Sequence, residues 1–238
     1  MNRPGESQVR TGYRMFGSLQ PTRYDLTFSV FGIPVRVLPT FWLTGVLFGF
    51  DLLHRGQNGP LLLLIWVAVV FVSILVHEFG HALTARAFGY PPRILMYHFG
   101  GLAMYEPHTR YTTAKAILIT LAGPGAGFLL FGLCYVLQTY LPRDPIVAEA
   151  IRMLIWVNLF WGLVNLIPVL PLDGGQVCRE VCLSISPRQG LKWALIIGML
   201  VGGAVAVGFW RIGLPYAAIL FAVLAVQSYM EFQQRRAW

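Results

Sequence analysis

The strongest constraint in this chain is an uncharged hydrophobic run that leads directly into a pentapeptide of histidines and a glutamate. Residues 61–76 contain no Asp, Glu, Lys or Arg, and the next five residues read HEFGH, from His77 to His81. An apolar stretch of this kind predicts a membrane-crossing helix, which needs about 20 residues. Ionisable side chains inside such a helix are costly and indicate a functional site. We therefore interpret the pentapeptide as the centre of the chain's chemistry.

The pentapeptide is an instance of H-E-x-x-H. His77 and His81 are four residues apart. On a helix they project from nearly the same face, so that both can bind one zinc ion. Glu78 can then act as general base toward a water molecule at the metal. A catalytic zinc site is expected to have a third protein ligand, with one position left for water.

The best candidate for that ligand lies in the segment NLIPVLPLDGG, residues 165–175. Its two prolines end a helix and its two glycines predict a sharp turn, which would put Asp173 on irregular backbone. An aspartate before Gly-Gly is ordinarily a turn residue, but the histidine pair favours a ligand. Asn165 can donate a hydrogen bond to an oxyanion. An interhelical hydrogen bond is its alternative role, and it is the role we expect for Asn158.

The composition is that of a membrane protein. Of 238 residues, 56% are hydrophobic and only 12% are charged, an excess of apolar residues over that of soluble domains. Six apolar segments are long enough to be drawn as spans, roughly 38–54, 61–85, 114–140, 147–169, 191–209 and 212–230. The three cysteines predict no disulfide framework, and we expect Cys134, Cys178 and Cys182 to be packing residues.

We attribute the net charge of +8 to the orientation of the chain in a membrane rather than to nucleic-acid binding. With six spans, 14 of the 18 Lys and Arg residues fall on the side of the two termini. The positive-inside rule then predicts a multi-pass protein of the cell membrane with both termini cytoplasmic. At about 1.5 Å per residue, His81 and His77 lie about 7 and 13 Å inward from Arg86, so the active site is expected toward the cytoplasmic side.

The predicted fold is an all-α membrane protein, a polytopic bundle of about six transmembrane helices with a small β-hairpin between the second and third spans. The hairpin is expected within 93–106, around Gly100-Gly101. A short strand is plausible within 25–37. Residues 1–24 are expected to form a cytoplasmic tail and 25–238 a single membrane domain. Glycines in the third and fifth spans predict close helix packing: Gly123, Gly127, Gly198 and Gly202.

These motifs resemble the site-2 protease family of intramembrane zinc metalloproteases, in its short six-span prokaryotic form. The resemblance rests on HEFGH, on Phe99-Gly100-Gly101, on Ala122-Gly123-Pro124 and on the 165–175 segment. It implies that His77, His81 and Asp173 bind one Zn²⁺ per chain, that Glu78 activates water and that Asn165 holds the substrate carbonyl or its oxyanion. The chain departs from the family at residues 125–128, where a member often has an asparagine.

The resulting functional prediction is a zinc-dependent endopeptidase that cleaves a peptide bond within or next to a transmembrane segment. Its expected partners are a single-span membrane protein substrate and the lipid bilayer, with no nucleic acid. Phe99, Gly100 and Gly101 are expected to bind the substrate by strand addition. The alternatives are a non-catalytic zinc-containing scaffold, a metal transporter and a membrane zinc hydrolase acting on lipid bonds. The presence of Glu78 argues against the scaffold, and the apolar outer half of the spans argues against the transporter.

Overall fold

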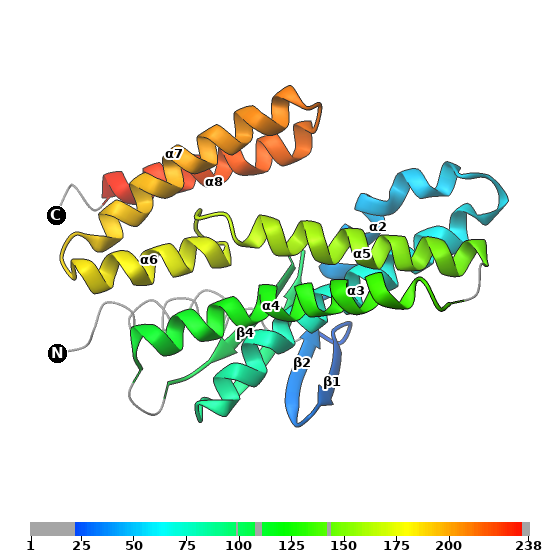
Figure 1. Ribbon diagram of the computed structural model, residues 1–238, viewed down its shortest axis with the longest axis horizontal. Helices are drawn as coiled ribbons and strands as arrows, with labels where there is room; N and C mark the ends of the chain where they lie inside the picture. Colours follow the sequence, from blue (N-terminus) through cyan, green and yellow to red (C-terminus); the bar gives the residue numbers. More distant parts are fainter. Residues whose placement is uncertain (1–21, 99, 108–110, 142–143, 235–238) are drawn as a thin grey trace. The chain divides into compact units, whose positions relative to one another are not determined.

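The computed structural model describes residues 22–98, 100–107, 111–141 and 144–234 (Figure 1). The chain divides into two compact units. The first unit contains the described residues within 1–110 and 122–162, and the second contains those within 111–121 and 163–238. The predicted N-terminal tail, residues 1–24, lies outside the described residues except for its last three.

The first unit contains a four-stranded sheet. Its order is β1-β2-β3-β4, in which the outer pairs are antiparallel hairpins and β2 runs parallel to β3. Ile33, Val35 and Val37 are buried at every second position of β2, the period expected of a strand with one face in a core. Phe31 and Gly32 adopt positive φ, so the predicted 25–37 strand turns back as a hairpin. The strands are β1 Leu26–Val30, β2 Ile33–Val37, β3 Pro92–Tyr97 and β4 Gly100–Tyr105.

Helices pack around this sheet within the first unit. Ile74 and Ala82 of α3 join the β2 side chains and Phe41 of α2 in one buried cluster. The predicted hairpin after the second span is confirmed as β3–β4. The helices are α2 Pro39–Gly49, α3 Gly59–Ala87, the part of α4 (Thr113–Leu137) from Ala122 onward, and α5 (Pro145–Asn165) up to Gly162.

The first predicted span, 38–54, is shorter than expected. It forms the 11-residue helix α2, followed by the 3-10 helices η1 (Phe50–His54) and η2 (Gly56–Asn58). Eleven residues rise about 16 Å at 1.5 Å each, about half of a hydrocarbon core. Among the described residues, five helical segments are long and apolar enough to cross a membrane, against the six drawn from the sequence. The five are Gly56–Ala87, Thr113–Leu137, Pro145–Asn165, Gly190–Arg211 and Pro215–Gln234.

The second unit contains three further helices, α6 Asp173–Ile185, α7 Gly190–Arg211 and α8 Pro215–Gln234. The predicted small-residue packing in the fifth span is confirmed. A Cβ added at Gly198 would lie 3.2 Å from Ser228 Oγ of α8, and one at Gly202 would lie 3.2 Å from Ala225 Cβ. Glycine therefore lets α7 and α8 approach closely.

The expectation of irregular backbone at Asp173 is wrong. The chain turns earlier, between Asn165 and Leu172, and Asp173 is already the first residue of α6. Gly174 and Gly175 are helical, and a Cβ on either would overlap the backbone of the preceding turn, at Leu166 and Val169. Close approach to that turn, rather than a sharp bend of their own, explains these glycines.

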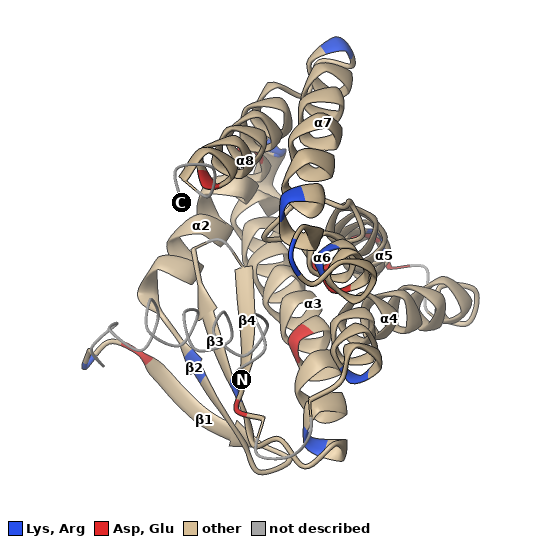
Figure 2. Ribbon diagram, turned by 90° about the vertical axis from the view of Figure 1, so that its left-hand side faces the viewer, with Lys and Arg blue, Asp and Glu red and all other residues tan. Residues whose placement is uncertain are grey.

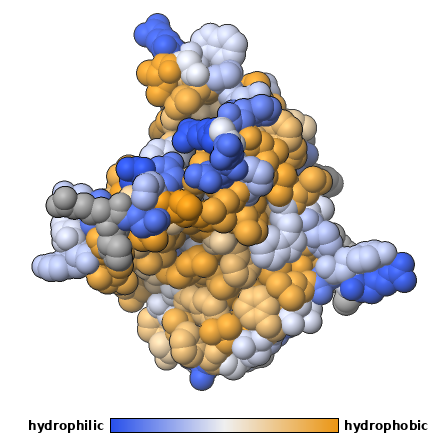
Figure 3. Space-filling model, turned by 90° about the vertical axis from the view of Figure 1, so that its right-hand side faces the viewer, coloured by the Kyte–Doolittle hydropathy of each residue, from blue (hydrophilic) through white to orange (hydrophobic). Residues whose placement is uncertain are grey.

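Apolar side chains remain exposed along the spanning helices. Leu129 of α4 is 77% exposed and Leu200 of α7 is 64% exposed. Charged segments are sparse along the helices in Figure 2, and hydrophobic residues cover much of the face shown in Figure 3. Such surfaces are stable against lipid rather than water, and in lipid a helix satisfies its own backbone groups. The chain is therefore a multi-pass membrane protein, as predicted.

Candidate metal centre

Three ionisable side chains are buried together in the second half of α3. His77, Glu78 and His81 are 3%, 5% and 8% exposed. Each offers one possible ligand atom, and these atoms all lie within 4.8 Å of one another. The helical periodicity of the H-E-x-x-H sequence produces this grouping directly, because residues four apart share a face.

The two imidazoles have the spacing of ligands that share one metal ion. His77 Nε2 and His81 Nε2 lie 3.2 Å apart, and the ring planes are inclined at 78°. Two nitrogens bound to tetrahedral zinc at about 2.0–2.1 Å would lie about 3.3 Å apart. The donor set therefore fits zinc, with Glu78 close enough to act on a water molecule beside the imidazoles.

The backbones of β4 and α4 lie close against these side chains. A Cβ added at Gly101 of β4 would lie 2.6 Å from Glu78 Cδ. One added at Gly123 of α4 would overlap the His81 imidazole at Nε2, and one at Gly80 would overlap the carbonyl of Ala122. The packing role predicted for Gly123 is thus confirmed, and its specific partner is a proposed metal ligand. No pattern in the sequence links these glycines to the histidine helix, because they lie on segments that are distant in the chain.

A buried polar contact joins α5 to α3 one turn before His77. Asn158 Nδ2 donates to Ser73 Oγ at 2.9 Å and to the carbonyl of Leu154 at 2.8 Å. Both Asn158 and Ser73 are 2% exposed. The interhelical role predicted for Asn158 is confirmed. Ser73, His77 and His81 follow one another at intervals of four on one face of α3, so this bond holds the face that carries the imidazoles.

The β3–β4 hairpin contributes a residue that the sequence reasoning missed. Burial raises the pKa of Tyr97 above its usual value, and the charge of Glu78 adds to the effect. Tyr97 pairs with Gly100 across the hairpin, and Trp161 of α5 packs against Gly100. Tyr97 lies two residues before the predicted substrate-binding residue Phe99, and this position is the feature of the sequence that could have pointed to it. Phe99 itself, a predicted substrate-binding residue, lies outside the described residues.

The remaining predicted site residues belong to the second unit. Asn165 is the last residue of α5 and Asp173 the first of α6, and they are 8% and 7% exposed. The N-terminus of a helix favours a carboxylate, since the helix dipole is positive there. Zinc binding by Asp173 and oxyanion binding by Asn165 stay predictions. His54 and His98 lie in η1 and in the hairpin turn, outside the group of His77, Glu78 and His81.

Comparison with known proteins gives a consistent family assignment. The chain is 32% identical over 212 residues to a putative zinc metalloprotease of Synechocystis, an alignment that covers 84% of this chain and 54% of that protein. It is 25% identical over 209 residues to a zinc metalloprotease of Methanocaldococcus jannaschii, with 87% and 59% covered. The chain thus spans little more than half the length of these two relatives.

A solved structure shares the fold. The site-2 protease from Methanocaldococcus jannaschii matches with a TM-score of 0.57 and 24% identity, over 89% of this chain and 94% of that one. The model of peptidase family M50 matches residues 65–152 and 144–209. These segments include both the H-E-x-x-H sequence and the 165–175 segment, and together they cover more than half of the chain. The chain belongs to peptidase family M50, the site-2 protease family.

Proposed function

We propose that this protein is a zinc-dependent endopeptidase that cleaves a peptide bond within or next to a transmembrane segment of a membrane protein. The observation that carries the proposal is the buried group of His77, Glu78 and His81 inside a membrane-spanning helix. Ionisable groups at such a position are retained for function. Membership of family M50 supports a metalloprotease, and the names of the relatives support zinc.

Each residue of the site has a distinct task in this reaction. His77 and His81 hold the metal, and Asp173 is the proposed third ligand. When bound, zinc acts as a Lewis acid on the scissile carbonyl and makes water acidic enough to lose a proton near neutral pH. Glu78 takes that proton and passes it to the leaving amine. Asn165 is proposed to donate its amide hydrogen to the carbonyl oxygen as negative charge develops there.

The substrate is proposed to bind as an added strand. β4 is an edge of the sheet, and its Gly101 lies against Glu78. A peptide that pairs with β4 would pass beside the general base, and its freed backbone groups would find partners in the sheet. Phe99, Gly100 and Gly101 are the proposed substrate-binding residues. The substrate helix must unwind first, because helical carbonyls are already hydrogen-bonded.

The proposed partners are a single-span membrane protein substrate and the lipid bilayer. The excess of Lys and Arg on one predicted side supports cytoplasmic termini and a site toward the cytoplasm. A shallow site of this kind would give water a short path to Glu78. Chemical labelling of single cysteines placed at the exposed ends of α7, tested from each side of the membrane, checks this orientation.

The decisive test is Glu78→Gln compared with the parent chain. Cleavage of co-expressed single-span proteins should fall by at least about a hundredfold, as expected for loss of a general base, while the zinc content stays unchanged. Glu106→Gln is the matched control, because Glu106 is half exposed and only weakly paired with Arg93. Unchanged cleavage or unchanged biological activity in Glu78→Gln would contradict the protease and favour a zinc-containing scaffold.

A further inference from the structure

A hollow at one end of α3 is separate from the candidate metal centre. It measures about 660 Å³. Its walls are the β1–β2 turn, the last turn of α3 and the connection from α3 into β3, all within the first unit. The aromatic ring of Tyr90, which is 0% exposed, stacks on Tyr105 of β4 at an interplanar angle of 11°. The wall beneath the hollow is therefore packed and already formed.

Two arginines supply the charge of this hollow. Arg86 comes from the last turn of α3 and Arg93 from β3, and both are exposed. The Arg86 guanidinium donates a hydrogen bond to the carbonyl of Phe31, which holds it at the rim. Arg93 lies 4.0 Å from Glu106, and both side chains are more than half exposed. A guanidinium has five N–H donors, and one exposed ion pair of this kind contributes little to stability and does not use all of them.

The backbone of the hollow adds few hydrogen-bond donors. Three of its lining residues are prolines, which have no N–H group. The N–H groups of Gly89 and Tyr90 donate to the carbonyls of Arg86 and Ala85 at the end of α3. An anion in the hollow would therefore be bound mainly by guanidinium groups. Their planar fork of donors matches the oxygens of a phosphate.

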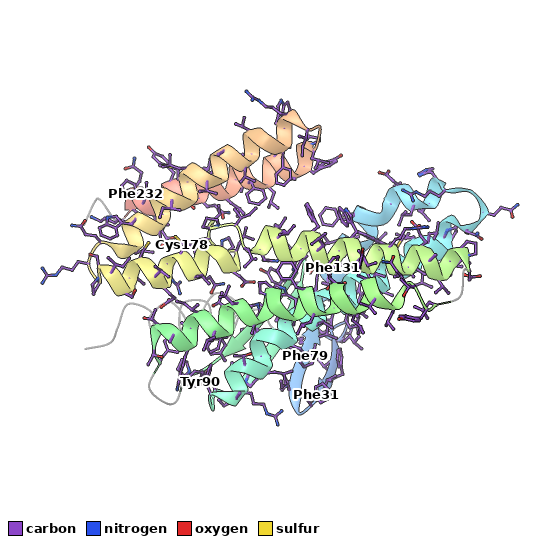
Figure 4. The ribbon with its side chains drawn as sticks, in the orientation of Figure 1. Phe31, Phe79, Tyr90, Phe131, Cys178 and Phe232 are labelled. Atoms are coloured by element: carbon purple, nitrogen blue, oxygen red, sulfur yellow. The ribbon has the colours of Figure 1, made fainter. Side chains whose placement is uncertain are left out.

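The hollow lies where a membrane surface would be. Arg86 is in the last turn of the spanning segment Gly56–Ala87. Phe31 is 72% exposed at the tip of the hairpin, and its ring packs edge-on against Phe79 of the same span (Figure 4). Exposed aromatic rings beside the end of a span are typical of the headgroup region of a bilayer. Lipid headgroups are therefore the phosphates that this hollow meets at the highest concentration.

We propose that this hollow binds the phosphate of an anionic membrane lipid, with Arg86 and Arg93 as the two phosphate-binding residues. Basic pockets beside membrane spans commonly bind anionic headgroups. The bound lipid would link the β1–β2 hairpin to the end of the helix that carries the histidines. The proposal is independent of the proteolytic activity proposed above.

The test is the thermal stability of the full chain in a neutral detergent. Short-chain phosphatidylglycerol should raise Tm in a saturable way, whereas phosphatidylcholine should raise it little at equal concentration. In Arg86→Gln/Arg93→Gln the apparent affinity for phosphatidylglycerol should fall about twenty-fivefold. Each arginine near a charged surface contributes about fivefold, and the two effects multiply. The control is Arg188→Gln/Lys192→Gln, which removes two exposed positive charges from the second unit. This control should bind phosphatidylglycerol like the parent.

A second variant separates binding from folding. Arg93→Glu leaves the Arg86 bond to Phe31 in place, so the hairpin stays anchored, and it should still abolish the preference for phosphatidylglycerol. Titration with inorganic phosphate distinguishes the source of the ligand. If inorganic phosphate raises Tm as much as phosphatidylglycerol does, the ligand is a soluble phosphate and not a lipid. Equal binding of the two lipids, or an unchanged affinity in both arginine variants, would overturn the site.

Discussion

At the scale of single residues, the candidate site depends on positions that have no side chain. Gly123 lies against the His81 imidazole, and a methyl group there would force the ring aside together with its Nε2 atom. Because a zinc ligand works only within a few tenths of an ångström of its proper distance, the displaced ring would bind metal poorly. The absent side chain at Gly123 is thus as much a requirement of the site as the imidazole itself.

We therefore expect Gly123→Ala to weaken zinc binding by at least about tenfold, the usual effect of disturbing a group that orients a ligand. Competition with a chromophoric chelator measures this affinity. Gly125→Ala is the matched control on the same helix, since a Cβ there meets nothing within 4 Å. Alanine also favours a helix more than glycine does, by up to about 1 kcal/mol, so helix propensity does not explain a loss of zinc affinity in either variant. Equal zinc affinity in the two variants would mean that Gly123 does not confine His81.

At the scale of elements, the bond between Asn158 and Ser73 fixes α5 against the histidine helix. Both side chains are buried, and removal of either leaves the other without this partner. A double-mutant cycle of Ser73→Ala and Asn158→Ala should give a coupling energy of about 0.6 kcal/mol, the average for such bonds between membrane helices. Unfolding in mixed micelles measures it. Additive effects of the two substitutions would show that the bond stabilises nothing.

The start of the sheet carries a second testable contact. Hydrogen bonds from Thr22 lower the pKa of Asp25 below its usual 3.8, and Arg36 of β2 adds to the effect through an ion pair at 2.6 Å. Since the folded pKa is the lower one, this stabilisation is fully present above the unfolded pKa. It is lost as the pH falls through the folded value.

Hydrogen exchange in β1 should report this loss. At pH 7, Asp25→Asn should exchange faster than the parent at Leu26–Val30, after correction for intrinsic rates. At a pH well below the lowered pKa of Asp25 the two should converge, because the parent's carboxyl is then neutral as well. Glu106→Gln is the control, with a weak, exposed pair that should matter little at either pH. A constant difference between Asp25→Asn and the parent at every pH would contradict this account.

Elements differ in how far the sequence could predict them. The β3–β4 hairpin and the histidine helix follow from local signals, a Gly-Gly pair and an uncharged apolar run long enough to cross a membrane. The length of α2 could not be predicted, because apolar residues continue past Gly49 while the backbone passes into a 3-10 helix. Gly174 and Gly175 suggested a loop, since glycine disfavours helices. Their need for close backbone contact with Leu166 and Val169 depends on tertiary structure alone.

At the scale of the whole molecule, the proposed ligand set names residues of both compact units. His77 and His81 belong to the first, and Asp173 belongs to the second. The pair of histidines could be predicted from their spacing, because a helix turns that spacing into a shared face. The contacts of Gly101 and Gly123 with the site could not be predicted, because they join segments that are far apart in the chain. The role of Asp173 rests on the motif, and metal binding offers a direct test of it.

If Asp173 is the third ligand, as proposed, one bound metal should protect residues of both units. A ligand that binds only the folded state stabilises it by about 4 kcal/mol at a thousand times its Kd. Removal of zinc by a chelator should therefore speed hydrogen exchange around His77–His81 and also in the first turn of α6, at Asp173–Gln176. In Asp173→Ala the α6 turn should no longer respond to the chelator, whereas Asp144→Asn, at an exposed helix start, should behave like the parent. If the parent's α6 turn ignores the chelator while α3 responds, zinc is held by the first unit alone and Asp173 is not a ligand.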